Sequence, residues 1–225
     1  EEKLEALQDA IAEVWASIVG PDPIEYRRER GLTEFIEEMG ILIQEVVGRR
    51  VGRWWLPAFA GVAFSLNEFR WSPRINREDG LIRLVPGLGT RAVDRVGDDF
   101  PILAVPGQPG LRSSVTTDEV LRYSPQMADV INLETNRFET VALADLLREA
   151  GTDYPLVDKI FSVYRERSLH KTSRFMMDPT ADDLVADMEG LLADTELIPQ
   201  LHRLMTTLAQ YLGTPVDIEF AHDGE

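Results

Sequence analysis

The sequence predicts an α+β fold in which helices pack against a largely antiparallel sheet. Strand-like segments are concentrated in the first third of the chain, helical periodicity returns after residue 180, and the chain closes on an alternating segment, 216–221. Segregation of strands from helices favours this class over a parallel α/β sheet, in which the two alternate. We expect residues 1–225 to form one domain.

Four segments predict helices because their apolar residues recur every three or four positions. Gly20 and Pro21 end the first, Gly151 and Gly213 close two others, and Thr180 is a suitable N-cap for the remaining one. The segments are 4–18, 142–150, 181–193 and 197–212.

Short apolar or alternating segments predict the strands. Residues 39–47 (MGILIQEVV) form an apolar run bounded by glycines, so we expect a buried strand there, with Gln44 as a buried amide that needs partners. Residues 98–118 are rich in Pro, Gly, Asp and Ser and predict an irregular connection, and 159–171 fits a hairpin or a broken helix. The other predicted strands are 59–69, 81–85, 129–133 and 216–221.

Composition excludes several classes of site. The 225 residues carry a formal net charge of −16, which disfavours nucleic acid and anionic membranes as partners. The sequence has no cysteine, which excludes disulfides and zinc–thiolate sites, and its histidines lack helical metal-binding spacing. The longest mostly apolar stretch, 54–64, is too short to cross a bilayer, so we expect a cytoplasmic protein.

Two carboxylates near the end of the chain are candidate metal ligands. Asp217 and Glu219 share one face of the strand 216–221, and residues two apart in a strand are separated by roughly 7 Å. Carboxylate oxygens at this spacing suit a hard divalent cation whose shell is completed by phosphate oxygens. An ordinary strand with one solvated face has the same pattern, and the spacing alone leaves both interpretations open.

A glycine turn follows one of the predicted strands. Gly87 and Gly89 bound this turn, whose backbone can approach phosphate groups closely, although the Lys-Ser/Thr pair of a P-loop is absent. Arg91 and Arg95 come next, where they either bind phosphate or balance nearby acids.

Five segments together resemble a known family. They are IAEVWASIVGPDPIEYRRERGL (11–32, matching at Ala16, Ser17, Tyr26 and Arg27), ILIQEVV (41–47), AGVAFSLNEF (60–69), GLGTRAVDR (87–95) and GTPVDIEFAHDG (213–224). In this order they are similar to the C-terminal portion of the PEP/pyruvate-binding, ATP-grasp domain of phosphoenolpyruvate synthases and pyruvate phosphate dikinases. Thr90 stands where the family usually has glutamate, and Ala60 where it often has serine.

The resemblance implies a partial ATP-grasp fold that binds ATP and Mg²⁺, in a protein that makes phosphoenolpyruvate from pyruvate through a phosphohistidine on another domain. It implies no catalytic residue within this chain. The implied metal ligands are Asp217 and Glu219, and the implied cofactor-binding residues are Gln44, Glu45 and Val47 on an adenine-binding strand, with Gly87, Gly89 and Arg91.

The sequence leaves several questions of function and organisation open. The same ATP module occurs in phosphotransferases with other acceptors, namely antibiotics or glucans, and a non-catalytic nucleotide sensor or scaffold is a further alternative. Residues 98–180 match only a narrower subgroup and form a family-specific middle segment. By itself the chain is expected to be an incomplete catalyst, and a homodimer is left open.

Overall fold

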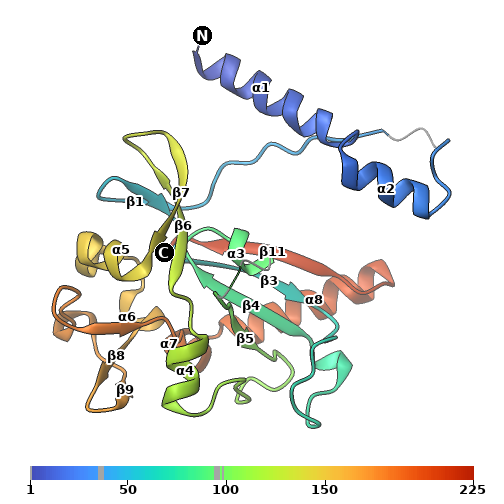
Figure 1. The fold of residues 1–225 in the computed structure, drawn as a ribbon. Coiled ribbons are helices and arrows are strands. Elements are labelled where there is room, and N and C mark those ends of the chain that lie inside the picture. Colours follow the sequence, from blue (N-terminus) through green and yellow to red (C-terminus); the bar gives the residue numbers. More distant parts are fainter. Residues whose placement is uncertain (1, 35–37, 94–96, 98) are drawn as a thin grey trace. The chain divides into compact units, whose positions relative to one another are not determined.

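The computed structural model describes residues 2–34, 38–93, 97 and 99–225. The chain divides into two compact units, Glu1–Val46 and Val47–Glu225. Helices and antiparallel sheets occur together, which confirms the predicted α+β class (Figure 1).

The described residues of the first unit form the helices α1 (Glu2–Ser17) and α2 (Pro21–Glu29). Helix α1 confirms the amphipathic segment predicted from its periodicity. Helix α2 was not predicted, because Gly20 and Pro21 indicated only the end of a helix. Proline also suits the first turn of a new helix, where its missing N–H would have no partner. The Arg27 guanidinium donates a hydrogen bond to the Ile18 carbonyl, at 2.7 Å, and ties the two helices together.

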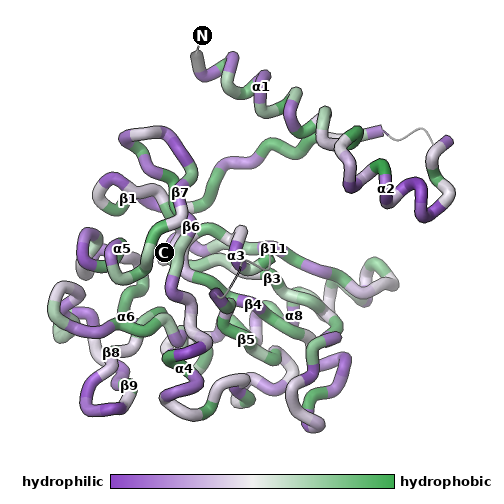
Figure 2. The backbone as a smooth tube through the Cα atoms, in the orientation of Figure 1, coloured by the Kyte–Doolittle hydropathy of each residue, from purple (hydrophilic) through white to green (hydrophobic). Residues whose placement is uncertain are grey.

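The predicted buried strand at 39–47 is wrong. Residues 38–48 have no regular secondary structure, Leu42 is 80% exposed, and Gln44 is exposed rather than buried. Figure 2 shows the hydrophobic colouring of this segment before β1. Within the described ranges no strand pairs with it, and an apolar run forms a strand only when a neighbour accepts its backbone hydrogen bonds.

The strands described in the second unit form three antiparallel sheets, and the sheet that concerns function has the order β11-β3-β4-β5. Its strands are β3 (Phe59–Phe64), β4 (Leu81–Pro86), β5 (Ile102–Ala104) and β11 (Asp217–His222). The second sheet has the order β1-β2-β6-β7, with β1 (Arg49–Val51), β2 (Trp54–Leu56), β6 (Met127–Asn132) and β7 (Arg137–Ala142). The third has the order β10-β8-β9, with β8 (Ser162–Arg165), β9 (Ser168–His170) and β10 (Asp183–Val185).

Helices connect and cover these sheets. Helix α8 packs against β3, and the short α3 lies over β3 and β4 (Figure 1). The helices are α3 (Thr90–Val93), α4 (Thr117–Tyr123), α5 (Leu143–Ala150), α6 (Val157–Ile160), α7 (Glu189–Asp194) and α8 (Leu197–Leu212), with 3₁₀ turns η1 (Arg77–Asp79), η2 (Gly151–Asp153) and η3 (Arg174–Met176).

Most of the predicted elements of the second unit are confirmed. They include β4, β6, β11, α5 and α8, while β3 ends before residue 69, and 159–171 is a hairpin, β8–β9. The irregular segment 98–118 also holds β5 and the start of α4. The helix predicted at 181–193 is wrong, because Leu184 and Val185 pair with β8 and only Glu189–Asp194 is helical. Thr180 hydrogen-bonds the Asp178 carboxylate instead of capping a helix.

The main core lies between the inner face of the β11-β3-β4-β5 sheet and the helices of the second unit. Tyr154 is fully buried there, its ring packs edge-on against Phe161 with centroids 5.2 Å apart, and its hydroxyl donates to the Ala58 carbonyl at 2.8 Å. Burial raises the pKa of Tyr154, and a hydrogen bond with the Gly87 backbone partly opposes that rise. The hydroxyl therefore links the start of β3 to the glycine turn after β4.

The glycine turn is also fixed by a buried charge cluster around Asp129 on β6. The Leu88 amide donates to the Asp129 carbonyl at 2.9 Å, and the hydroxyls of Thr90 and Thr140 donate to its carboxylate. Arg91 lies 3.7 Å from the same carboxylate and donates to Asp99 at 2.9 Å. These contacts join the turn to the neighbouring sheet and hold it in one position.

Gly61 on β3 leaves no room for a side chain between β4 and β11. A Cβ atom at this position would lie 2.3 Å from the Arg83 carbonyl oxygen and 2.8 Å from the Phe220 ring. Only glycine fits there without a shift of β4 or β11.

We therefore expect Gly61→Ala to lower the free energy of unfolding by about 3 kcal/mol, the upper part of the range for an overpacked core. Gly110→Ala is the matched control, since a Cβ there meets no atom within 4 Å. Urea denaturation of the two variants is the measurement, and equal stabilities would contradict the close approach.

Replacing Arg91 tests the buried charge cluster. Its side chain is 10% exposed, and Arg91→Met leaves two buried carboxylates without their cation, which is expected to cost about 3 kcal/mol of stability. Arg148→Met removes an ion pair whose side chains are 59% and 73% exposed, so its effect should stay within about 0.5 kcal/mol. Thermal and urea unfolding compare the two, and a neutral Arg91→Met would show that the cluster does not stabilise the fold.

Candidate functional site

The outer face of the β11-β3-β4-β5 sheet carries the two predicted metal ligands. Exposure alternates along β11, so the Asp217 and Glu219 side chains are exposed while Ile218 and Phe220 pack against the core. The antiparallel register places Glu219 opposite Val62 on β3. The predicted alternation is therefore confirmed, and both carboxylates lie on one face of the sheet, at its exposed β11 edge.

An arginine on the same face was missed by the sequence analysis. Arg83 on β4 pairs with Val62, and residues directly opposite each other in an antiparallel sheet project to the same side. Two strand spacings separate the backbones of Arg83 and Glu219, which is about 10 Å. The available signal was the single charge within the otherwise apolar strand LIRLVP.

Contacts of Arg83 direct its side chain along this face. The guanidinium lies over the Phe64 ring, 5.2 Å from its centroid, and donates a long hydrogen bond of 3.5 Å to the Ala92 carbonyl on α3. A cation over an aromatic face is held by the ring quadrupole. The charge is thereby held on this face of the sheet, against Phe64 and α3.

The glycine turn borders the same face. Ala92 on α3 packs with Val62 and Val85, and a Cβ at Gly89 would lie 3.3 Å from the Ala60 Cβ. Gly87 has a φ of +74°, and a Cβ there would lie 2.6 Å from the Asp129 carbonyl oxygen. The structure therefore brings Gly89 to the face that carries Asp217 and Glu219, whereas Gly87 is buried against β6.

The other predicted cofactor-binding residues are placed differently. Arg91 is engaged with two carboxylates in the buried cluster, and Arg95 lies outside the described residues. Gln44 and Glu45 belong to the first compact unit, and Val47, like them, is exposed and outside any strand. Their contact with adenine stays a prediction.

The donor set of the face suits a hard cation. Two carboxylates offer oxygen ligands, and Mg²⁺ usually takes one or two protein carboxylates together with water and substrate phosphates. Across the described ranges, side chains of His, Asp and Glu do not gather in threes around a possible metal position. Asp217 and Glu219 therefore fit a Mg²⁺ ion that arrives with a phosphate ligand, and do not form a closed metal cage.

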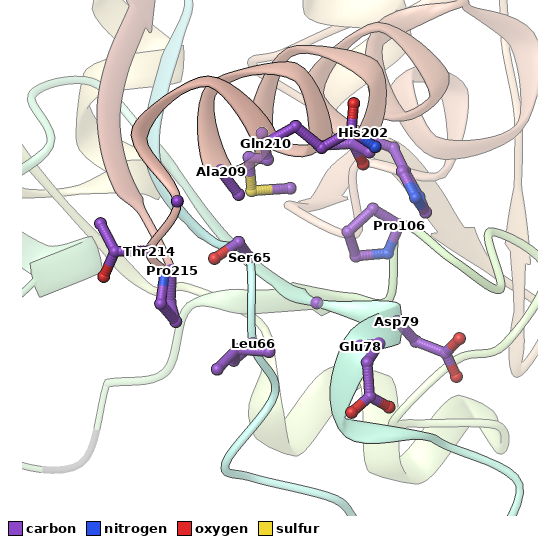
Figure 3. Close-up of a pocket in the computed structure, with 14 residues that line it drawn as sticks. Ser65, Leu66, Glu78, Asp79, Pro106, His202, Ala209, Gln210, Thr214 and Pro215 are labelled. Atoms are coloured by element: carbon purple, nitrogen blue, oxygen red, sulfur yellow. The ribbon is translucent and has the colours of Figure 1, made fainter.

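A cavity of about 390 Å³ lies on another side of the second unit, beneath α8 (Figure 3). Glu78 and Asp79 approach it from η1, and His202 lies across from them on α8. Asp79 already accepts hydrogen bonds from the Asn76 amide and the Gln108 side chain, at 2.7 and 2.6 Å. None of the outer-face residues lines this cavity, so the two features are separate.

Among the residues that the structure describes, every helix is too short or too polar to span a bilayer.

None of the curated proteins compared with the chain matches it. A family model described as pyruvate phosphate dikinase, AMP/ATP-binding domain, matches residues 2–225. The chain therefore belongs to the family of pyruvate phosphate dikinase AMP/ATP-binding domains.

Proposed function

We propose that the outer face of the β11-β3-β4-β5 sheet binds the phosphates of Mg²⁺-ATP in a phosphoenolpyruvate synthase-like phosphotransferase. The acceptor in this proposal is pyruvate, reached through a phosphohistidine on a domain outside this chain. The observation that carries the proposal is the shared face of Asp217, Glu219 and Arg83 beside the glycine turn.

Each group on this face has a distinct task. Asp217 and Glu219 hold the metal ion, which neutralises charge on the transferring phosphoryl group when it is bound. Arg83 supplies a fixed positive charge that interacts with phosphate oxygens and resists displacement, because Phe64 and α3 hold the guanidinium. In this proposal the backbone at Gly89 approaches the same oxygens, with no side chain there in the way, and Gly87 fixes the turn through its contacts with Tyr154 and β6.

Thr90 supports a second candidate function. Its hydroxyl donates to the buried Asp129 carboxylate, so the side chain that replaces the family's usual glutamate is used for the fold. A face that lacks this acid and still binds nucleotide would act as a sensor or scaffold without phosphoryl transfer. ATP binding without ATP turnover would favour this alternative.

Replacing Glu219 tests the metal ligand. We expect Glu219→Gln to weaken Mg²⁺-ATP binding by about tenfold or more, because a charged ligand is worth roughly 1.4 kcal/mol or more. Titration calorimetry in magnesium and in excess EDTA measures the effect, which should be largest with the metal present. Glu134→Gln removes the same charge from an exposed loop and should leave the affinity within about twofold. Equal affinity in Glu219→Gln and wild type would remove this residue from the site.

Replacing Arg83 tests the phosphate contact separately from the metal. Arg83→Met keeps most of the apolar stem but loses the charge, so ATP binding should weaken by about tenfold in magnesium and in EDTA alike. Arg137→Met, on the exposed part of β7, is the control. A loss seen only with magnesium would assign Arg83 to the metal's surroundings instead of the phosphates.

A further inference from the structure

A row of apolar side chains crosses the second sheet, β1-β2-β6-β7. The register pairs Trp55 on β2 with Ile131 on β6, and Ile131 with Phe138 on β7. Residues directly opposite each other in an antiparallel sheet project to the same side, so these three side chains form one row, the apolar row. Trp54 and Val130, their neighbours along the strands, are buried in the main core, so the apolar row lies on the opposite, outer face. Phe138 is 54% exposed, and the other two side chains are partly buried.

Helix α3 joins this outer face to the face of the proposed phosphate site. It packs over β3 and β4 through Ala92, which contacts Val62 on the outer face of the first sheet. The hydroxyl of Thr90, at the start of the same helix, donates to the carboxylate of Asp129 on β6. Asp129 comes two residues before Ile131, so its side chain projects from the same face as the apolar row, about 7 Å away along the strand. The outer faces of the two sheets therefore meet at α3, beside β6 (Figure 1).

Gly48 precedes β1 and lies against the edge of the Trp55 indole. A Cβ atom at Gly48 would lie 2.9 Å from the Trp55 Nε1 atom. Gly48 directly follows Val47, which the family resemblance predicts to contact adenine. The apolar row therefore lies next to the end of the predicted adenine-binding segment, in the same compact unit as Val47.

The chemistry of the apolar row suits a flat base. Aromatic side chains stack on the π-face of a base, and Ile131 extends the apolar surface between the two rings. The six register pairs between β6 and β7 hold this surface in place before a ligand arrives, so little ordering is needed on binding. The apolar row therefore favours the base of a nucleotide, while the charged groups that suit its phosphates, Arg83 and Glu219, lie on the neighbouring sheet.

We propose that the apolar row binds the purine base of the nucleotide whose phosphates occupy the β11-β3-β4-β5 sheet. This assignment rests on the proposed function and extends it, because it adds Trp55, Ile131 and Phe138 to the nucleotide site. The ribose then lies near α3, which borders both faces.

The test compares two ligands, one with a base and one without. Mg²⁺-ATP and Mg²⁺-tripolyphosphate are titrated into the wild-type chain and its variants by calorimetry. Phe138→Ala removes an exposed ring, so it should weaken ATP binding about fivefold or more, as expected for one stacked ring, and leave tripolyphosphate binding within about twofold. Phe175→Ala is the matched control, because Phe175 is 96% exposed on η3, outside the apolar row, and both affinities should stay unchanged.

Further variants separate stacking from a general disturbance of the sheet. Phe138→Trp keeps an aromatic ring and should bind ATP at least as tightly as the wild type. Trp55→Leu keeps an apolar side chain but loses the ring, and it should weaken ATP binding about fivefold or more, with urea denaturation confirming that the variant is folded. Glu219→Gln should weaken the binding of both ligands, because its proposed role concerns the metal and the phosphates.

The two ligands also distinguish failure of the base site from failure of the proposed function. Unchanged ATP affinity in Phe138→Ala would overturn the apolar row as the base site and leave the phosphate site standing. An equal loss of ATP and tripolyphosphate binding in that variant would also overturn it, because the ring would then act on the phosphates. If the wild-type chain binds neither ligand, the proposed function is wrong, and the base site is wrong with it.

Discussion

One buried carboxylate, that of Asp129, joins the two four-stranded sheets of the second unit. Asp129 lies on β6, and its backbone forms a parallel bridge with Gly87, the residue that follows β4. A buried charge is costly unless hydrogen bonds and a cation compensate it, so its donors cannot be removed without a large loss of stability. Thr90 and Arg91 supply that compensation from the segment that follows the glycine turn. The position of the turn is therefore a consequence of where this charge is neutralised.

This junction also explains why neighbouring residues of one motif have different tasks. Gly89 borders the face that carries Asp217 and Glu219, whereas Gly87 is buried against β6, and Thr90 and Arg91 bind buried carboxylates through their side chains. A loop that approaches phosphate groups must be rigid to contribute binding energy, since ordering it on binding would consume part of that energy. The contacts of Gly87, Thr90 and Arg91 provide the rigidity, and Gly89 has no side chain to cover the backbone.

Much of the fold could be predicted from sequence because its signals are local. Periodicity identified α1, α8 and β11, and the period of two in β11 separated Asp217 and Glu219 from the core-facing residues. The strand at 39–47 could not be judged in this way, since a strand depends on a neighbour and an apolar run does not reveal whether one is present. The helix predicted at 181–193 failed for the reverse reason, because pairing with β8 outweighed its helical periodicity.

The candidate site also combines features that follow from local sequence with features that depend on contacts between distant residues. The two carboxylates follow from strand alternation alone, whereas Arg83 becomes part of the site only through the register that pairs β3 with β4. Register depends on contacts between residues far apart in the sequence, so Arg83 could not be selected from among the arginines of one chain. The apolar row is a still less local feature, because its three side chains come from separate strands and meet only through the register of the second sheet.

The exposed segment 41–47 has a consequence for the behaviour of the protein in solution. Exposed apolar residues with high β-propensity that lie outside any strand are a usual starting point for association between chains. The polar pair Gln44 and Glu45 interrupts this run, and the net charge of −16 keeps molecules apart by mutual repulsion. That repulsion acts over about 8 Å at physiological ionic strength and over a shorter range in concentrated salt. The acidic composition therefore opposes association between chains through this exposed segment, and high salt weakens that repulsion.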